Sequence, residues 1–540
     1  MGRVEGDDIL IAMNRESIKG DMENLNPFGL VLHNQTINPG EMDKTITAYA
    51  MPVDDLVKSC GFASSLNVYL ANMIYTGVLA YLIGIDMPQL EEALDYHFGG
   101  KRSAIDPNLC AINKAYAWAQ ETISVPFHLR LEPMKANDEK ILLDGNTAAA
   151  LGAHYGGLQF AAWYPITPAT SLAETINEYI PSLRTDRETG NNSCVVVQAE
   201  DELAAIGMVV GAGWAGLRAM TSTSGPGMCL MSEFLGLAYF TEVPLVVWDV
   251  QRVGPSTGMP THTSQSDLTF SYFMSHGDKD FVILIPANMN ECFEFGWKAL
   301  DIAEELQTPV IVLSDLELGM NIWAADKLEY PDVSMKRGKT LWENDLAQFA
   351  KKHNREWGRY LDVDGDGITY RTLPGNMNEK AAYFTRGTSH DDFAHYSEKP
   401  EDWEKNILRL KRKIEKAKAL VPQPEIQWRN LKDAIISYGS TDMAIDETID
   451  ILKSSGIRID YLRIKALPLN PEIEKFIQSH ERIFVVENNR DGQMKQILCI
   501  NYPNQAEKFI SISKSDGMAL SAKWISTQIF ACIHGEKQND

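Results

Sequence analysis

The sequence lacks any pair of cysteines at the CxxC spacing that is typical of zinc and iron–sulfur sites. Its seven cysteines are scattered along the chain, and their odd number gives no disulfide framework. Scattered cysteines of this kind are typical of a reducing compartment. We therefore predict no metal-binding residues and no iron–sulfur cluster in this chain.

Basic residues and long apolar runs are also scarce. The chain has 50 Lys and Arg residues against 73 Asp and Glu residues, which gives a formal net charge of −23. Such a charge disfavours a surface for nucleic acid or for an anionic membrane. No apolar run reaches the ~18 residues that span a bilayer, and the N-terminus lacks the basic and apolar regions of a signal peptide. We expect a cytoplasmic protein with neither nucleic acid nor membrane as a partner.

The length of 540 residues exceeds what one hydrophobic core serves, so we expect roughly three or four domains. The residue patterns place an N-terminal α/β domain at residues 1–132 and a domain of alternating strands and helices at 141–322. An irregular connecting segment follows at 323–423, and a second α/β pattern occupies 425–540. The sequence thus predicts a multidomain α/β protein.

The alternating domain carries the clearest pattern. Its predicted strands are nearly continuous runs of β-branched and apolar residues, at 195–198, 219–222 and 244–250, and its predicted helices lie at 202–215 and 228–240. This alternation indicates a mostly parallel, doubly wound sheet with both faces covered. Binding sites in such folds lie beyond the carboxyl ends of the strands.

A proline-flanked turn, Tyr164-Pro165-Ile166-Thr167-Pro168, is the most informative short motif of the chain. Two prolines restrict their own φ and that of the residues before them, so the Thr167 hydroxyl is held on a stiff turn. A fixed hydroxyl suits a substrate-positioning site, because little entropy is lost on binding. An ordinary proline-rich turn is the other interpretation.

Two charged motifs follow predicted strands of the same sheet. Glu202 closes the acidic run Glu200-Asp201-Glu202, which either stabilises a helix N-terminus or reaches a ligand. Arg252 precedes a Gly/Pro-rich loop, where a fixed guanidinium suits bidentate capture of a carboxylate. A surface arginine paired with Asp249 or Asp267 is the alternative. The loop at 221–227 is a further such motif, and their convergence on one sheet edge predicts a site.

Two other motifs have weaker functional interpretations. The glycines from Gly211 to Gly216 match a GxGxxG spacing, but they fall at a predicted helix end and not between a strand and a helix. Asp362, Asp364 and Asp366 resemble half of a calcium loop, yet Leu373 stands where the bidentate glutamate belongs. An Asp–Gly turn is the favoured interpretation, and binding of a divalent ion is left open.

Together the motifs resemble those of the α subunits of 2-oxoacid:ferredoxin oxidoreductases. The strongest parts are Tyr164–Pro168, Gln198–Glu202 and Gln251–Gly258, and the order and spacing of the three are specific. Glu487-Asn488-Asn489 is similar to the family's C-terminal domain, which is of the transketolase C-terminal type. The resemblance covers the chain from about Asp144 to the C-terminal domain.

The resemblance implies that the alternating domain binds the pyrimidine ring of thiamine diphosphate. Glu202 would then be the catalytic residue that hydrogen-bonds this ring, with Tyr164, Pro165 and Ile166 also at the cofactor. Thr167 and Arg252 would bind the substrate. The implied reaction is the oxidative decarboxylation of a 2-oxoacid with coenzyme A, which gives acyl-CoA and carbon dioxide and passes two electrons to ferredoxin.

The resemblance also implies a partner. No convincing GDG…N motif for Mg²⁺ and diphosphate is present, and in the family this motif and the 4Fe–4S cluster belong to a separate β subunit. We therefore expect a site at an α–β interface, inactivity of the chain alone, and a dimer of α–β pairs. The N-terminal domain resembles the family's γ domain but starts downstream of its glycine-rich unit, so we expect it to be incomplete.

Three alternatives remain at this point. The chain could serve another thiamine-dependent decarboxylase or transferase, a scaffold subunit without catalysis, or a calcium-binding module. The Arg252 loop and the connecting segment resemble those of the family. This resemblance favours 2-oxoglutarate over pyruvate and branched 2-oxoacids as the substrate.

Overall fold

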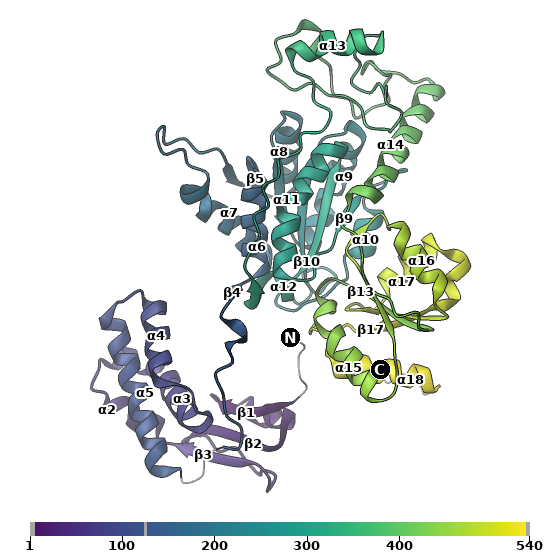
Figure 1. Ribbon diagram of the computed structural model, residues 1–540. Helices are drawn as coiled ribbons and strands as arrows, with labels where there is room; N and C mark the ends of the chain where they lie inside the picture. Colours follow the sequence, from purple (N-terminus) through teal and green to yellow (C-terminus); the bar gives the residue numbers. More distant parts are fainter. Residues whose placement is uncertain (1–5, 124–126, 536–540) are drawn as a thin grey trace. The chain divides into compact units, whose positions relative to one another are not determined.

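The chain divides into two compact units, one ending at residue 138 and the other beginning at residue 139. The computed structural model describes residues 6–123 and 127–535 (Figure 1). The predicted outer domain limits at residues 1 and 540 fall outside this part of the chain. The internal boundaries predicted from the sequence remain predictions.

The N-terminal unit contains a parallel sheet with the strand order β1-β2-β3. The strands are β1 (Asp7–Ala12), β2 (Leu25–Asn34) and β3 (Thr47–Met51), and the helices are α1 (Ile18–Asp21), α2 (Val53–Ser59), α3 (Asn67–Ile83), α4 (Met87–Phe98) and α5 (Arg102–Thr122). Helices α3 and α5 pack closely at Gly77, where an added Cβ would lie 2.3 Å from the Ile112 carbonyl oxygen. Glycine is required there because two helix backbones meet.

Helix α3 is an exception to the expectation that no segment of the chain is long and apolar enough to span a bilayer. Within the described residues, the helical stretch Ser64–Ile83 is the one segment whose length and composition would allow it to cross a membrane. A buried core helix meets the same criterion, and Leu70, Ile74, Val78 and Leu82 of α3 are buried in the core of this unit.

The larger unit is built on a seven-stranded sheet with the order β15-β9-β10-β8-β7-β5-β6. Its strands are β5 (Phe160–Trp163), β6 (Val195–Gln198), β7 (Ala219–Thr223), β8 (Leu245–Gln251), β9 (Val282–Leu284), β10 (Pro309–Asp315) and β15 (Ala466–Leu467). Its helices are α6 (Gly145–Tyr155), α7 (Thr170–Leu183), α8 (Glu202–Trp214), α9 (Gly225–Thr241), α10 (Leu268–Phe273), α11 (Met289–Leu306) and α12 (Leu316–Met320). All strand pairs are parallel except β15–β9. The predicted doubly wound sheet is therefore confirmed.

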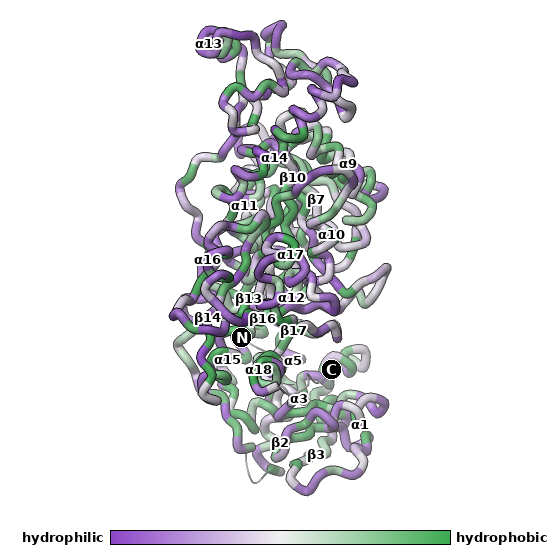
Figure 2. Tube along the Cα trace, turned by 90° about the vertical axis from the view of Figure 1, so that its right-hand side faces the viewer, coloured by the Kyte–Doolittle hydropathy of each residue, from purple (hydrophilic) through white to green (hydrophobic). Residues whose placement is uncertain are grey.

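The centre of this sheet is buried and mainly apolar. Every residue of β8 and β10 is buried, and Figure 2 shows β10 as a mainly hydrophobic segment inside the unit. A strand covered by helices on both faces has no solvated side, so it reads as a continuous apolar run. Such a rigid sheet fixes the positions of the loops that follow its strands.

The sequence did not predict α6, β5 and α7. Helix α6 has no polar face to reveal its period, since Ala148, Ala149, Ala150 and Ala153 are all buried. An added Cβ at Gly152 would lie only 2.0 Å from the Phe293 carbonyl oxygen of α11. A helix that packs this closely must use small residues, which weakens its hydrophobic pattern.

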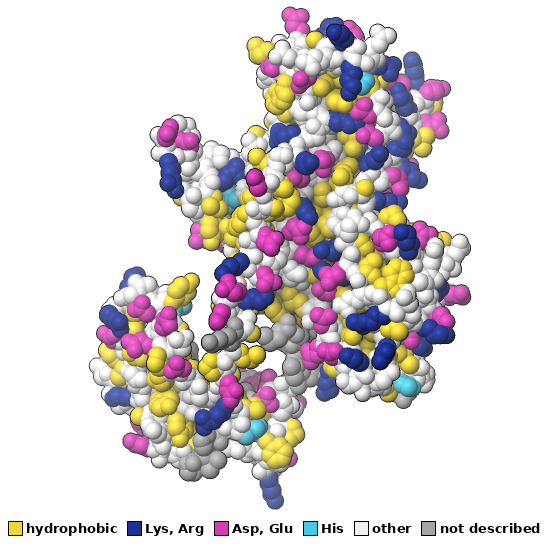
Figure 3. All heavy atoms as spheres, in the orientation of Figure 1, with side chains coloured by type: hydrophobic (Ala, Val, Ile, Leu, Met, Phe, Trp, Pro, Cys, Tyr) yellow, Lys and Arg dark blue, Asp and Glu magenta, His cyan; other side chains and the backbone are white. Residues whose placement is uncertain are grey.

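The connecting segment contains β11 (Trp323–Asp326), α13 (Glu343–His353) and α14 (Pro400–Leu420). Strand β11 pairs antiparallel with β4 (Lys140–Leu143). The sequence at 401–420, with a few apolar residues among many charges, predicts a charged surface helix, and Figure 3 shows Lys and Arg side chains gathered over α14.

The inner side of α14 corrects the prediction of a simple surface helix. Arg409 and Lys413 are buried and bind the buried carboxylate of Glu242, the residue that ends α9. Arg409 donates to it over 2.6 and 3.0 Å, and Lys413 over 2.9 Å. The sequence of α14 could not reveal this contact, because the carboxylate lies far away in the chain.

The acidic loop at Asp362 forms the favoured Asp–Gly turn. The Asp362 carboxylate accepts hydrogen bonds from the amides of Gly365 and Gly367, at 2.9 and 3.0 Å. Asp364 and Asp366 both bind the Lys339 ammonium, at 2.7 and 2.8 Å. The carboxylates that would coordinate a cation thus already have a protein cation between them.

The C-terminal domain has a five-stranded sheet with the order β12-β14-β13-β16-β17. Its strands are β12 (Glu425–Gln427), β13 (Asp433–Tyr438), β14 (Asp460–Ile464), β16 (Arg482–Glu487) and β17 (Phe509–Ser513), and its helices are α15 (Ile445–Ser454), α16 (Pro471–Ser479), α17 (Gln493–Asn501) and α18 (Ala522–His534). Strand β15 leaves this domain and extends the larger sheet at β9. Gln265 adds a second link, since its side chain accepts from Asn488 N and Thr441 Oγ1 and donates to the Tyr438 carbonyl.

Candidate active site

Four neighbouring strands of the seven-stranded sheet end at the predicted site. In sheet order β8, β7, β5 and β6 lie side by side and are all parallel, so their carboxyl ends meet at one edge. The Arg252 loop follows β8, the start of α9 follows β7, the proline turn follows β5 and the acidic run follows β6. The convergence predicted from the sequence is therefore present.

Hydrogen bonds to neighbouring helices hold the proline turn in place on both sides. The Ile166 amide and carbonyl both bond to the Thr170 hydroxyl in the first turn of α7, at 3.0 and 3.1 Å. The Pro168 carbonyl accepts from the buried Asn146 Nδ2 at 2.9 Å. Tyr164 and Thr167 themselves are exposed at the strand end. The turn is thus rigid while its functional groups remain accessible.

Arg252 binds the proline turn directly. Its Nη1 donates to the Thr167 carbonyl at 2.7 Å, and the side chain is only 7% exposed. Burial lowers the pKa of Arg252, while its Nε has no hydrogen-bond partner. Because Arg252 is buried, the alternative of a surface arginine is wrong, but its electrostatic attraction to Asp267, one of the two partners named in that alternative, is present.

The loop after Arg252 needs glycine for its shape. Gly258 has a φ of 55°, and an added Cβ would lie 1.8 Å from the Val253 carbonyl oxygen. Ser256 also adopts a positive φ, 58°, which is uncommon for a residue with a side chain. Backbone strain of this kind is typical of loops that serve a binding site.

Glu202 is the first residue of α8 and is only 7% exposed. The preceding Asp201 caps the helix by accepting from the Ala204 amide at 2.6 Å, so Glu202 is not needed as the cap. Its carboxylate lies against Gly227 of α9, where an added Cβ would be 2.8 Å from Glu202 Cγ and 3.1 Å from Oε1. No described residue donates a hydrogen bond to this carboxylate, which leaves it able to accept one from a ligand.

A cavity of about 680 Å³ opens beside these residues. Arg252, Pro226 and Asp267 form one wall, and Asn489 and Gln493 of the C-terminal domain form another. Its volume is in the range of ordinary small-molecule sites, about 300–1,000 Å³. Glu202 does not line the cavity itself, but its neighbour Gly227 directly follows the lining residue Pro226.

Sequence reasoning missed two acidic residues near this wall as functional groups. Asp249 lies inside the buried strand β8, and Asp267 lines the cavity at the N-cap position of α10, where its side chain makes no capping hydrogen bond. Burial raises the pKa of Asp267 to about 7 and that of Asp249 well above its usual range. The available signal was a charged residue within the apolar run Leu245–Gln251, which a buried strand tolerates only for a reason.

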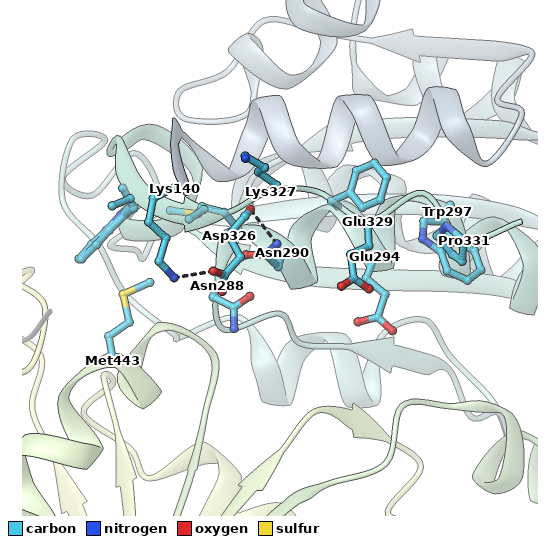
Figure 4. Close-up of a pocket in the computed structure, with 15 residues that line it drawn as sticks. Lys140, Asn288, Asn290, Glu294, Trp297, Asp326, Lys327, Glu329, Pro331 and Met443 are labelled. Atoms are coloured by element: carbon cyan, nitrogen blue, oxygen red, sulfur yellow. Dashed lines mark hydrogen bonds and ion pairs between the residues drawn. The ribbon is translucent and has the colours of Figure 1, made fainter. Parts of the chain in front are cut away.

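A second cavity of about 670 Å³ lies along α11 and the β4–β11 ribbon (Figure 4). Figure 4 shows Lys140 directed at Asp326, and Trp297, Glu294 and Glu329 at its other end. None of the residues predicted to bind substrate or cofactor lines it. Within the described part of the chain, no group of three or more His, Cys, Asp or Glu side chains is placed to hold a metal ion.

Two family models match the chain. One, described as the thiamine-diphosphate-binding domain of pyruvate flavodoxin/ferredoxin oxidoreductase, covers residues 151–365. The other, described as pyruvate ferredoxin/flavodoxin oxidoreductase, covers residues 2–118. The first contains the whole sheet edge described above.

Several curated relatives are similar over most of the chain. An α subunit of a 2-oxoacid:ferredoxin oxidoreductase from Aeropyrum pernix is 33% identical over 79% of this chain and 66% of its own length. The corresponding subunit from Saccharolobus solfataricus is 35% identical over 69% of this chain and 58% of its own length. The chain therefore spans about three fifths to two thirds of these relatives. The 2-oxoglutarate synthase subunit KorA of Methanothermobacter marburgensis is 36% identical over 66% of this chain and 89% of its own length.

A solved structure shares the fold. The 2-oxoglutarate:ferredoxin oxidoreductase from Magnetococcus marinus, with 2-oxoglutarate, coenzyme A and succinyl-CoA bound, matches 97% of this chain and 88% of that chain. The TM-score is 0.85 at 28% sequence identity.

Proposed function

Because this chain belongs to the family of 2-oxoacid:ferredoxin oxidoreductase α subunits, we propose that it forms half of the active site of such an enzyme. The reaction converts a 2-oxoacid and coenzyme A to acyl-CoA and carbon dioxide, and ferredoxin accepts two electrons. The observation that carries the proposal is the buried, unbonded Glu202 carboxylate at the sheet edge that also presents Arg252 and Thr167. Its setting is the cytoplasm.

The residues present fit thiamine diphosphate. The Glu202 carboxylate can accept a hydrogen bond from the aminopyrimidine ring, since no described residue uses it and Gly227 leaves room beside it. Tyr164, Pro165 and Ile166 offer a fixed turn at the neighbouring strand end. When bound, the cofactor supplies the carbanion chemistry of decarboxylation, while the protein supplies orientation and charge.

Arg252 and Thr167 bind and orient the substrate. The hydrogen bond from Arg252 Nη1 to the Thr167 carbonyl holds the guanidinium beside the exposed threonine hydroxyl. The remaining guanidinium donors can take up the carboxylate of a 2-oxoacid, and the hydroxyl can bond to a neighbouring substrate oxygen. Because both groups are fixed before binding, little orientational freedom is lost when the substrate enters.

A β subunit completes the site. Leu203 and Met208 of α8 and Leu230 of α9 are exposed by 42%, 42% and 47%, although all three are apolar. These helices begin at Glu202 and at the Gly225–Gly227 turn, so a partner covering them would also close the site over the cofactor. We assign the Mg²⁺ and diphosphate site and the 4Fe–4S cluster to this partner, with the assembly a dimer of α–β pairs.

The substrate is 2-oxoglutarate. The KorA relatives are named 2-oxoglutarate synthase subunits, and the structural neighbour was solved with 2-oxoglutarate, coenzyme A and succinyl-CoA bound. Pyruvate and branched 2-oxoacids are the alternatives that a substrate panel separates.

The test uses the chain co-expressed with its β subunit. Reduction of ferredoxin or a low-potential dye should depend on both subunits, on thiamine diphosphate and on coenzyme A. Glu202→Gln should lower kcat about 10²- to 10⁴-fold, because a positioned proton-sharing group is lost. Glu200→Gln changes an exposed neighbour and should leave activity intact. Full activity of Glu202→Gln would favour a scaffold role, and turnover without ferredoxin or dye would favour another thiamine-dependent lyase.

A further inference from the structure

Three carboxylate oxygens are buried without any hydrogen-bond partner next to the proposed substrate site. They are Asp249 Oδ1, Asp249 Oδ2 and Asp267 Oδ2. Asp249 is completely buried. Isolated buried carboxylates are so unfavourable that such groups take up a proton instead. The proposed mechanism leaves both residues without a role.

Both residues are fixed close to Arg252. Asp249 stands on β8, the strand that Arg252 follows, and Asp267 lines the same cavity as Arg252. The Asp267 amide donates to Gln251 Oε1 at 3.0 Å, and Gln251 Nε2 donates to the Ser314 carbonyl at 3.0 Å. The Asp267 carboxyl group also lies against Gly225, where an added Cβ would be 2.7 Å from its Oδ2.

The charged and titratable groups around Asp267 come from four elements. Asp249 on β8 and Cys229 on α9 both interact electrostatically with it, and Arg252 in the loop after β8 lowers its pKa. Arg490 and Asp491 of the C-terminal domain also line the cavity, but they bond to each other at 2.7 Å. Two neighbouring carboxyl groups in such a setting do not both ionise, since like charges disfavour each other.

We propose that the buried carboxyl groups of Asp249 and Asp267 are protonated and act as positioning groups that keep the Arg252 guanidinium free for the carboxylate of the substrate. This inference rests on the proposed function, in which Arg252 binds the 2-oxoacid. A fully ionised pair would place an additional negative charge at the guanidinium and compete with the incoming carboxylate. Protonation of the two carboxyl groups removes that competition, since Asp267 is the carboxyl group that attracts Arg252 when it is ionised.

The first test measures the pH dependence of KM and kcat in the assembled complex. Loss of the Asp267 proton should raise KM for the 2-oxoacid as the pH rises, by up to about tenfold per pH unit, with little change in kcat. Asp267→Asn keeps the shape of the side chain but cannot ionise, so its KM should stay nearly constant from about pH 6 to pH 8. Asp278→Asn, a change at an exposed aspartate, should keep the wild-type profile. An unchanged pH dependence of KM in active Asp267→Asn would overturn the proposal.

The second test needs no activity. Infrared spectroscopy of the full chain should show the C=O stretching band of protonated carboxyl groups near neutral pH, and Asp249→Asn and Asp267→Asn should each weaken it; a band that neither variant weakens would overturn the inference. Absence of this band from the wild-type chain would overturn the inference. A complex that is inactive with every 2-oxoacid would instead refute the proposed function, while the infrared test would still decide whether the two carboxyl groups are protonated.

Discussion

Gly227 determines how the Glu202 carboxylate lies. A Cβ at this position would be 2.0 Å from Thr223 Oγ1 and 2.8 Å from Glu202 Cγ. We expect Gly227→Ala to displace the carboxylate and lower kcat/KM of the complex about 10²-fold, because small displacements in a fixed site are costly. Steady-state kinetics with thiamine diphosphate in excess measure the effect.

Gly211→Ala is the matched control for this change. Gly211 lies in α8 with open space around it, so alanine should raise stability by up to about 1 kcal/mol and leave activity unchanged. Wild-type kinetics of Gly227→Ala would show that the geometry of Glu202 does not matter for catalysis.

The raised pKa of Asp267 should also make the free energy of unfolding depend on pH. Burial raises the pKa of Asp267 to about 7, so the folded chain binds more protons than the unfolded chain between about pH 4 and pH 7. The free energy of unfolding contributed by this residue therefore falls as the pH rises through that window, by roughly 1–3 kcal/mol. Denaturant unfolding at about pH 5 and pH 8 should show a smaller difference for Asp267→Asn than for the wild type. An equal difference in both proteins would contradict this linkage.

Single residues show where sequence reasoning succeeds. Glu202 and Arg252 each follow a strand that is recognisable from its apolar run, so their arrival at one edge could be predicted, whereas Thr167 stands out for its prolines and not for the strand β5 before it. The contacts of these residues could not be predicted, since the bond from Arg252 to the Thr167 carbonyl depends on the order of strands within the sheet. Asp267 is separated from Asp249 by a loop, and only the folded chain shows that both are buried without partners.

At the scale of elements, Glu242 joins α14 to the end of α9. Arg409 and Lys413 lose the carboxylate that they share when Glu242 is changed, while both cations remain buried. We expect Glu242→Gln to lower the free energy of unfolding by about 3–5 kcal/mol and to reduce hydrogen-exchange protection in α14. Glu415→Gln removes an exposed partner of Lys418 on the same helix and should cost at most about 1 kcal/mol. Equal effects of the two changes would mean that the buried network is not what holds α14.

Elements also differ in how far the sequence predicts them. The strands β7, β8 and β10 could be predicted because short apolar runs bounded by turn residues are typical of buried strands. Helix α6 could not, since its buried alanines and glycines show no amphipathic period. The burial of Arg409 and Lys413 could not be predicted either, because a charged side chain is expected to be exposed unless its partner is known.

At the scale of the whole molecule, the exposed apolar residues on α8 and α9 predict where the β subunit binds. Met208→Glu and Leu230→Glu should weaken the complex at least about tenfold, since each would bury an unpaired charge at the interface. Co-purification and titration of the tagged chain with its partner measure the affinity. Met377→Glu, at a residue 84% exposed in the connecting segment, is the control. Unaltered binding of both α8 and α9 variants would place the partner elsewhere.

The two-residue strand β15 ties the C-terminal domain to the larger sheet through main-chain pairing with β9. Truncating the chain ahead of that domain would leave the buried strand β9 as an unpaired edge strand, and an exposed apolar edge is prone to self-association. A truncated protein that lacks the C-terminal domain therefore needs a substitute for the β15 pairing before it can be expected to stay in solution.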